Sequence, residues 1–212
     1  MEEQMTDRRQ KRQPARRKKK RGGFARRLIG LLIAAVLVIG IGGLGVWLLW
    51  DRQPQTTVTT YPVEYEDLIR KYAGENDLEP AYVAAVVLAE SSYRADAVSS
   101  VNAQGLMQIL PSTGEWLSGK FDEAYVEGCL FDPETNLRYG CWYLGWLMER
   151  YNGDMSCASS AYHQGQGTVD GWLQNPEYSK DGKSLSNIPS EATKTYVDRI
   201  LKYYEKYEEI YA

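Results

Sequence analysis

The feature that most constrains this chain is an uncharged apolar run of 23 residues, from Leu28 to Trp50, built of Leu, Ile, Val, Ala, Gly and Trp. At about 1.5 Å of rise per residue, a helix of this length crosses a hydrocarbon core of roughly 30 Å. Trp47 and Trp50 stand near its far end, where indole side chains favour the membrane interface. We therefore expect a transmembrane helix over residues 28–50.

The charge differs in sign on the two sides of this run. Residues 1–27 hold twelve Lys or Arg and three Asp or Glu, a net charge of +9, and the other 185 residues hold thirteen basic and twenty-five acidic ones, a net charge of −12. Positive residues flanking a membrane span stay in the cytoplasm. We expect a basic cytoplasmic tail over 1–27, a single-pass signal anchor in the cell membrane, and an extracytoplasmic domain beyond it.

Three other interpretations of the N-terminal region fit less well. A cleavable signal peptide has an apolar core of about 7–15 residues and a small-residue cleavage site, whereas this core is longer and no clear Ala-x-Ala follows it. No cysteine precedes Cys129, which excludes a lipoprotein anchor at this segment. The basic run from Arg16 to Arg21 fits membrane topology and anionic lipid better than a nucleic-acid partner, and we expect no nucleic acid.

Residues 51–63 read DRQPQTTVTTYPV, a polar, Thr-rich stretch with two prolines that is typical of a linker. Thirteen residues reach at most about 45 Å, so the folded part must work close to the membrane surface. Apolar residues then recur with a helical period at Tyr65, Leu68, Ile69 and Tyr72.

The rest of the chain also has helical periodicity, without a sustained period of two. Pro80 and Pro133 suit the first turn of a helix. Further helices are predicted over residues 80–92, 111–117, 133–151, 156–163, 167–174 and 190–207. The prediction is a mainly α domain over residues 64–212.

Cysteine is sparse in this chain. Cys129, Cys141 and Cys157 allow three single disulfide pairings, and each leaves one thiol over. Without a neighbouring cluster of His with Asn or Asp, we interpret none of the three as a nucleophile and expect structural burial for all of them.

A carboxyl group lies on the apolar side of the predicted helix over 80–92. Val83, Val86 and Val87 form an apolar stripe, and Glu90 follows Val83 by seven residues on the same stripe. Burial disfavours the charged form, so the pKa of Glu90 should rise. A protonated carboxyl near neutral pH is what a leaving glycosidic oxygen needs.

The same pattern also fits a purely structural carboxylate. Glu90 could complete helix packing through a hydrogen bond to Ser91 or Ser92, and the pattern alone favours this interpretation. The segment from Ser99 to Pro111 (SSVNAQGLMQILP) adds small and amide residues that let backbone approach a ligand and bind sugar hydroxyl and N-acetyl groups. Met107 beside them fits a core position and a ligand contact equally well.

Taken together, Glu90-Ser91-Ser92-Tyr93 and the run from Ser99 through Gly105-Leu106-Met107-Gln108-Ile109-Leu110-Pro111 resemble the soluble lytic transglycosylase (SLT) domain, which is related to goose-type lysozymes. Later residues match in the same order. They are Asn136-Leu137, Gly140, Tyr143-Leu144, Ala161-Tyr162, Ile188-Pro189, Thr193, Tyr196 and Val197. The resemblance covers about residues 65–207 and implies a mainly α, lysozyme-like fold.

The resemblance implies an activity on peptidoglycan. Glu90 would protonate the glycosidic oxygen between N-acetylmuramic acid and N-acetylglucosamine, and then deprotonate the 6-hydroxyl of the muramic acid to form a 1,6-anhydro sugar. One carboxylate then suffices, and neither cofactor nor metal is implied. The expected substrate-binding residues are Ser91, Ser99, Gly105, Met107, Gln108, Tyr162, His163, Glu191 and Tyr196. Tyr162 and Met107 fit structural positions as well.

Two places depart from the family pattern. The usual Ala-Tyr-Asn-Ala-Gly reads Ala161-Tyr162-His163-Gln164-Gly165, and His163 is the only histidine. We favour a sugar contact for His163 over a packed imidazole. Near the C-terminus the family has Glu directly before Thr, but this chain has Ala192 there and Glu191 one place earlier. One residue along a helix turns a side chain by about 100°, so Glu191 would point in a different direction from the carboxylate of the family pattern.

Two alternative functions stay open at this point. A muramidase would hydrolyse the same bond with water, with a second carboxylate such as Asp96 or Glu191 to place that water. A weakly active wall-binding module would explain the altered residues at 163, 164 and 192. Peptidoglycan glycan strands are the expected partner, with cell-wall or secretion machinery as further partners that the sequence does not identify.

Overall fold

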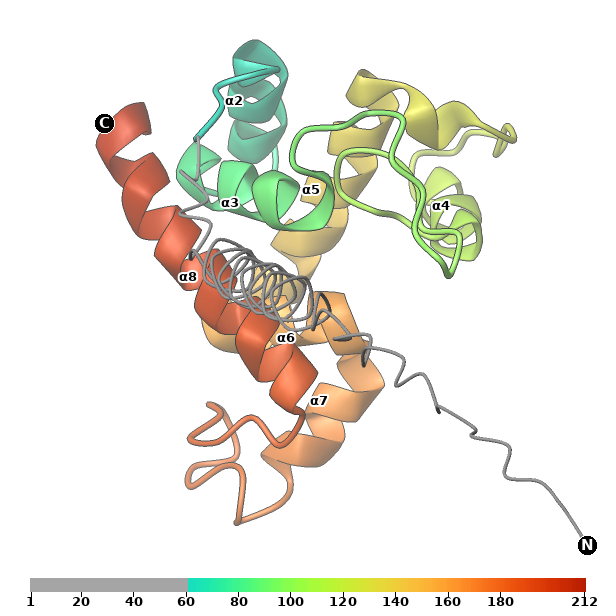
Figure 1. The fold of residues 1–212 in the computed structure, drawn as a ribbon. Helices are drawn as coiled ribbons and strands as arrows, with labels where there is room; N and C mark the ends of the chain where they lie inside the picture. Colours follow the sequence, from blue (N-terminus) through green and yellow to red (C-terminus); the bar gives the residue numbers. More distant parts are fainter. Residues whose placement is uncertain (1–60) are drawn as a thin grey trace, which may run out of the picture. The chain divides into compact units, whose positions relative to one another are not determined.

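Prolines and N-cap side chains set where most helices of the C-terminal part begin. The computed structural model describes residues 61–212, shown in colour in Figure 1. Three helices have proline in their first turn. At the start of another, the Asp154 side chain accepts the backbone N–H of Cys157 at 2.8 Å. In chain order the helices are α2 (Glu66–Gly74), α3 (Pro80–Ser91), α4 (Pro111–Ser118), the 3₁₀ turn η1 (Cys129–Phe131), α5 (Pro133–Arg150), α6 (Met155–Gln164), α7 (Gln166–Leu173) and α8 (Glu191–Tyr211).

The mainly α prediction is confirmed for the part that the structure describes. Each helix predicted from the sequence is present, with ends that differ by a few residues. The longest difference is at α8, which continues to Tyr211 rather than ending near Tyr207. Within residues 61–212 the extended structure amounts to two isolated bridges, at Val98–Gln104 and Gln104–Ile109, in the segment between α3 and α4.

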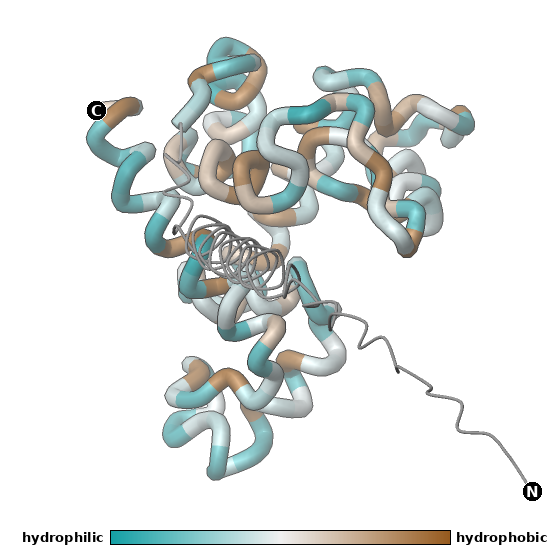
Figure 2. Tube along the Cα trace, in the orientation of Figure 1, coloured by the Kyte–Doolittle hydropathy of each residue, from teal (hydrophilic) through white to brown (hydrophobic). Residues whose placement is uncertain are grey.

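Helix α3 is the centre of the core, and the predicted apolar stripe of Val83, Val86 and Val87 is buried as part of a helix that is apolar all round. Every residue from Ala81 to Leu88 is buried, at most 8% exposed, so the helix has no polar face along this stretch. Helices α2 and α8 both contact α3, and small side chains such as Ala84 and Ala85 let neighbours approach from several sides. Figure 2 shows the contrast between the hydrophobic α3 and the mostly hydrophilic outer helix α8. Glu90 therefore lies in the last turn of a helix that is buried on all sides from Ala81 to Leu88.

Helices α6 and α8 complete the surroundings of α3. Figure 1 shows α8 running past α3 and α6, and both contacts are present in the structure. The buried hydroxyls of Tyr82 and Ser159 lie 2.8 Å apart and join α3 to α6. A second, smaller hydrophobic cluster holds α5, α6 and α7 together around Leu147, Cys157 and Val169. Helix α3 is thus packed against α8 and joined to α6.

The three cysteines form no disulfide with one another. Cys141 and Cys157 are fully buried, as expected for structural thiols, whereas Cys129 is partly exposed. Burial raises the pKa of the Cys157 thiol to about 12, which keeps it protonated and unreactive at neutral pH.

The predictions for the N-terminal region fall outside the described residues. They are the basic tail over 1–27, the transmembrane helix over 28–50 and most of the linker over 51–63. Among the helices from α2 to α8, none combines the length and apolar character that a membrane span needs.

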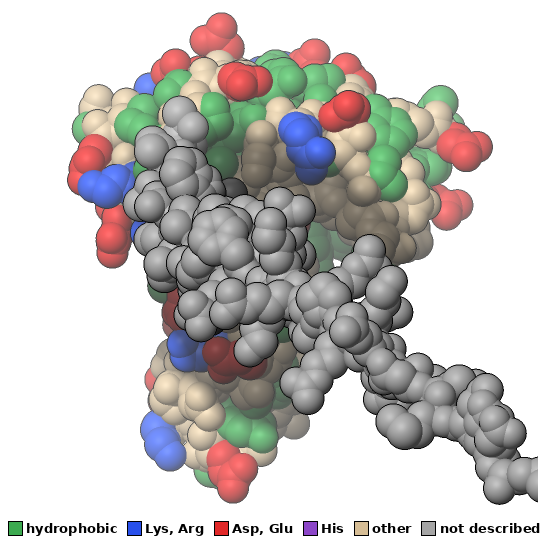
Figure 3. Space-filling view, viewed as in Figure 1, with side chains coloured by type: hydrophobic (Ala, Val, Ile, Leu, Met, Phe, Trp, Pro, Cys, Tyr) green, Lys and Arg blue, Asp and Glu red, His purple; other side chains and the backbone are tan. Residues whose placement is uncertain are grey.

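The described part is acidic. After Asp51 and Arg52 are also set aside, residues 61–212 hold 24 acidic and 12 basic side chains, a net charge of −12. Figure 3 shows acidic side chains spread over the face in view, with fewer basic ones between them. A surface of this charge attracts cations and repels anionic polymers.

Candidate active site

The carboxyl group of Glu90 is held at the C-terminal turn of α3. The phenol of Tyr196 on α8 donates a hydrogen bond to Glu90 Oε1 at 2.6 Å. Burial raises the pKa of Glu90 to about 7, and the Tyr196 hydrogen bond and the positive charge of Arg199 offset only part of that rise. A carboxyl group with this pKa is present in both protonation states near neutral pH, so it can give and take a proton.

Two tyrosines lie around this carboxyl group. Tyr196 is 3% exposed, and burial together with the negative charge of Glu90 raises its pKa well above the usual value. Burial and the same charge also raise the pKa of Tyr162. Both phenols therefore stay neutral, and Tyr196 remains a hydrogen-bond donor.

Met107 and Tyr162 connect the segment after α3 to helix α6. The Tyr162 hydroxyl donates to the backbone carbonyl of Met107 at 2.8 Å. The Met107 side chain is fully buried, and a Cβ added to Gly140 on α5 would lie 2.2 Å from its sulfur. Met107 is thus packed against α5, and its backbone rather than its side chain is tied to the tyrosine beside Glu90.

Asn136 organises the same segment, and sequence reasoning gave it no role in the site. It is fully buried on α5. Its Oδ1 accepts the backbone N–H of Met107 at 2.8 Å, and its Nδ2 donates to the carbonyls of Gln104 at 2.9 Å and Leu130 at 2.8 Å. The signal that could have identified this role is an Asn at a buried position of an amphipathic helix, because such a side chain needs hydrogen-bond partners.

Gly105 is required where the segment passes Asn136. Its φ of +75° lies in the left-handed region, which favours glycine. An added Cβ would lie 2.1 Å from the Leu130 carbonyl oxygen and 2.3 Å from Asn136 Nδ2, which is too close for any side chain. Gly105 is therefore packed closely against Leu130 and Asn136 in this structure.

Three further predicted residues bind the segment to itself or to α3. The buried Ser91 hydroxyl donates to the Leu106 carbonyl at 2.8 Å. Ser99 Oγ accepts the backbone N–H of Ala103 at 3.0 Å. The Gln108 side-chain amide donates to the carbonyls of Gly105 at 2.9 Å and Ala97 at 3.2 Å. These polar groups fix the shape of the loop beside Glu90.

The residues that depart from the family pattern lie between α6 and α8. The His163 ring stacks on Tyr196 with a centroid distance of 4.6 Å, and its Nδ1 lies 3.2 Å from Thr193 Oγ1. Burial and the charge of Arg199 lower the pKa of His163, which favours a neutral imidazole. The Thr193 hydroxyl also donates to Gln164 Oε1 at 3.0 Å. His163 and Gln164 thus contact the start of the helix that carries Tyr196.

Glu191 is not brought to this cluster by any contact. It is exposed in the first turn of α8, and its side chain makes no hydrogen bond or ion pair with another residue in 61–212. The neighbouring Ala192 is exposed as well.

A band of aromatic rings extends from Tyr162, and the sequence interpretation did not identify it. Tyr143 on α5 lies 5.5 Å from the Tyr162 ring and stacks on Trp146 at 6.1 Å. Trp116 on α4 contacts Tyr143 edge-on at 6.0 Å. A cavity of about 210 Å³ opens beside Trp116 and Tyr143, with Gln166 on its wall. Aromatic faces next to polar groups suit the flat, hydroxylated faces of sugar rings.

The helical fold is shared with a class of known structures. An inactive mutant of the lytic transglycosylase Slt from Pseudomonas aeruginosa superposes with a TM-score of 0.65 and 27% identity, covering 76% of this chain and 26% of that one. The 70 kDa soluble lytic transglycosylase from Escherichia coli superposes with a TM-score of 0.63 and 30% identity, covering 71% of this chain and 25% of the other. The fold is that of the lytic transglycosylases.

Residues 67–185, more than half of the chain, match the transglycosylase SLT domain, and the chain belongs to this family. It is 31% identical over 166 residues to the soluble lytic murein transglycosylase of Escherichia coli K12, covering 73% of this chain and 26% of the relative. It is 30% identical over 170 residues to the membrane-bound lytic murein transglycosylase C of Actinobacillus pleuropneumoniae serotype 5b, covering 68% and 46%. The chain thus spans about a quarter of the Escherichia coli protein and under half of the other.

Proposed function

We propose that this protein is a peptidoglycan lytic transglycosylase that cleaves the β-1,4 bond between N-acetylmuramic acid and N-acetylglucosamine. The observation that carries the proposal is the half-buried Glu90, whose pKa is raised to about 7 and which accepts a hydrogen bond from Tyr196. Family membership and the names of the relatives support the same substrate.

The proposed reaction uses Glu90 twice. The protonated carboxyl donates its proton to the glycosidic oxygen as the bond from that oxygen to C1 of the muramic acid breaks. The resulting carboxylate then takes the proton of the muramic acid 6-hydroxyl, whose oxygen forms a new bond to C1. Glu90 ends protonated, no water is consumed, and the product is a 1,6-anhydro sugar. A pKa near 7 suits a group that must act first as acid and then as base.

The charges around Glu90 favour this route over two-carboxylate hydrolysis. Inverting and retaining hydrolases place a second carboxylate across the bond. Within the described residues, the groups that shift the pKa of Glu90 are Tyr196 and Arg199, and no second carboxylate is among them. The two candidates for a second carboxylate, Asp96 and Glu191, are both exposed. A hydrolytic muramidase and a weakly active wall-binding module are the alternatives that experiment must exclude.

We further propose that a membrane anchor holds the enzyme at the cell surface. In this arrangement residues 1–27 stay in the cytoplasm, 28–50 cross the membrane, 51–63 form a linker, and 64–212 form the catalytic domain outside. The 23-residue apolar run and the +9 charge before it support this topology. Labelling with a cysteine-reactive reagent that does not cross membranes tests this topology. A cysteine introduced at Ser184 should react in intact cells, and permeabilising the cells should not increase its labelling.

The activity is tested with the full chain in non-ionic detergent. Purified peptidoglycan is incubated with the wild-type protein, with Glu90→Gln, and with Glu205→Gln as a control for the loss of one exposed carboxylate on α8. We expect Glu90→Gln to release muropeptides at least about a thousandfold more slowly, since proton transfer and the base step are both lost. Glu205→Gln should match the wild type. Equal release by Glu90→Gln would contradict the proposed role, and no release by any form would favour a binding module.

A further inference from the structure

A second cavity, of about 580 Å³, lies between α5 and the turn that joins α2 to α3. Residues Trp142, Trp146 and Glu149 reach it from α5 at spacings of four and three, which place them on one helix face. The floor is backbone: a Cβ added to Gly145 would lie 2.8 Å from the Asn76 carbonyl oxygen. The cavity is thus a feature of two packed elements, apart from the residues around Glu90.

Two indole rings form the apolar part of this cavity. Within residues 61–212 neither indole N–H donates a hydrogen bond, so Trp142 and Trp146 both keep a free donor. Two basic side chains already lie near these rings. Lys120 Nζ lies 6.0 Å from the Trp142 ring centroid, and the Arg150 guanidinium lies 5.6 Å from that of Trp146. These faces therefore suit a positively charged ligand that also has an apolar stem.

Two carboxylates add negative charge to the same cavity. Asp77 comes from the turn after α2 and Glu149 from the end of α5. In the described part of the chain, neither side chain makes an ion pair or a hydrogen bond. Arg150, the basic residue next to Glu149, is paired with Asp170 instead. The surrounding net charge of −12 strengthens the attraction for a cation.

We propose that this cavity binds a primary ammonium group on a flexible alkyl chain, the chemistry of the side-chain amine of a diamino acid in a wall peptide. The methylenes would lie against Trp142 and Trp146, with the charge between Asp77 and Glu149. The aromatic band from Tyr162 through Tyr143 to Trp146 joins the surroundings of Glu90 to this cavity. The wall-peptide source of the amine rests on the proposed function, because such peptides branch from the glycan strand that Glu90 would cleave.

The binding test needs no activity. Nα-acetyl-lysine N-methylamide is titrated into the full chain in non-ionic detergent by calorimetry, with the Nα,Nε-diacetyl compound as its uncharged match. We expect the amine to bind at least about fivefold more tightly than the diacetyl compound. The cavity variant, which carries Asp77→Asn and Glu149→Gln together, should bind the two compounds equally. Asn tolerates the positive φ of position 77, and both side chains are exposed, so this variant should fold.

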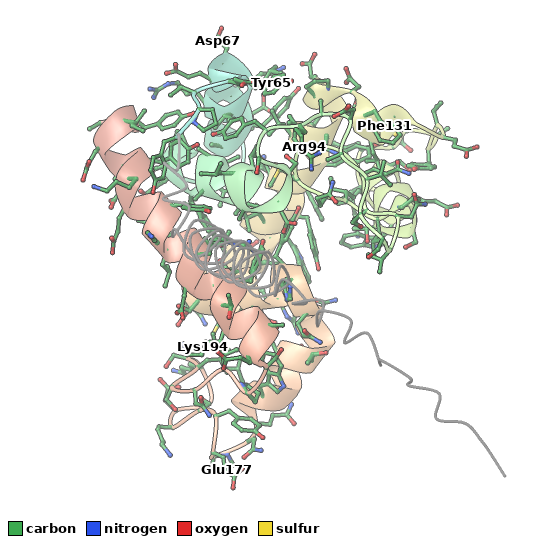
Figure 4. All side chains as sticks on the ribbon, viewed as in Figure 1. Tyr65, Asp67, Arg94, Phe131, Glu177 and Lys194 are labelled. Carbon is green, nitrogen blue, oxygen red and sulfur yellow. The ribbon has the colours of Figure 1, made fainter. Side chains whose placement is uncertain are left out.

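A matched control removes two carboxylates elsewhere. The control variant, Glu127→Gln with Glu177→Gln, has the same net charge as the cavity variant, Asp77→Asn with Glu149→Gln. Figure 4 shows Glu177 at the opposite end of the described part from Asp67 of α2, the helix that precedes Asp77. The control should bind the amine as the wild type does. Equal affinity for amine and diacetyl compound, or equal weakening in both double variants, would overturn the proposal.

A second arm identifies the source of the amine. Peptidoglycan with free peptide amines and the same material acetylated at those amines are digested by the wild type and by the cavity variant. We expect acetylation to slow the wild type about fivefold and to leave the cavity variant unaffected. Binding of the lysine compound without this difference would overturn the wall-peptide assignment. Absence of any digestion would count against the proposed function, while the calorimetric result would still decide the cavity.

Discussion

The phenol of Tyr196 lies 2.6 Å from the carboxyl oxygen of Glu90 and joins residues that are 106 positions apart in the chain. Burial raises the pKa of Glu90 to about 7, and this hydrogen bond offsets part of that rise. The protonation state of Glu90 near neutral pH is therefore set by two opposing effects, and each can be changed separately.

Removing the phenol should move the pH dependence of activity. In Tyr196→Phe the stacking partner of His163 is kept and only the hydrogen bond to Glu90 is lost. Because that bond favours the carboxylate, the pKa of Glu90 should rise, and the alkaline limb of kcat/KM should move to higher pH by about one unit. A pH profile of muropeptide release checks this. An alkaline limb that stays in place or moves to lower pH would contradict the assigned hydrogen bond.

Glu90 should also make the fold less stable as the pH rises. Its pKa is about 7 in the folded protein and near 4.5 in the unfolded chain, so between these values the folded state binds more protons. Stability linked to Glu90 is then fully present below pH 4.5 and is lost as the pH rises through 7, by about 3 kcal/mol.

Urea unfolding of wild type and Glu90→Gln at pH 4 and pH 8 measures this effect. The variant should gain about 3 kcal/mol relative to the wild type between the two pH values, since Gln does not ionise. A difference that does not change with pH would show that Glu90 titrates normally in the folded protein.

Asn136 should matter for stability more than its size suggests. In Asn136→Ala the Met107 N–H and the Leu130 carbonyl lose their partner in a buried position. We expect a loss of about 2–4 kcal/mol in the free energy of unfolding, because buried polar groups without partners are costly. Asn175→Ala, which removes one exposed hydrogen bond to the Glu177 N–H, should cost under about 1 kcal/mol. Similar losses in both variants would contradict the central position given to Asn136.

Two glycines with positive φ allow packing to be separated from backbone strain. Gly105 has a φ of +75° and Gly128 a φ of +83°. An added Cβ would lie 2.1 Å from the Leu130 carbonyl oxygen at Gly105, whereas at Gly128 it would meet nothing within 4 Å. Gly128→Ala should cost about 1 kcal/mol from strain alone. Gly105→Ala should cost at least about 2 kcal/mol more, because the Leu130 carbonyl must move. Equal unfolding free energies for the two variants would show that the segment does not pass close to α5.

Local signals explain which parts of the fold could be predicted from the sequence. Helix starts at Pro80 and Pro133 depend on residues a few positions away, so they were visible in the chain. The burial of α3 was not, because Ala84 and Ala85 do not reveal how many neighbours will pack against them. The predicted stripe therefore accounts for only part of the buried surface of α3.

The residues of the candidate site could likewise be predicted only in part from the sequence. Glu90 stood out through its place in a motif, and its neighbour Tyr196 through a match late in the chain. The role of Asn136 depends on a hydrogen bond across 29 positions, and the aromatic band on the meeting of α4 with α5. Such contacts are set by tertiary packing, which a single sequence does not display.

The most direct test of the proposed mechanism follows the oxygen atoms. Peptidoglycan is digested by the full chain in water enriched in oxygen-18, and the products are reduced at once with borohydride and weighed by mass spectrometry. The account predicts products one water lighter than hydrolytic muropeptides, resistant to reduction and free of oxygen-18. Reducible products that carry one oxygen-18 atom would contradict it and identify a hydrolase.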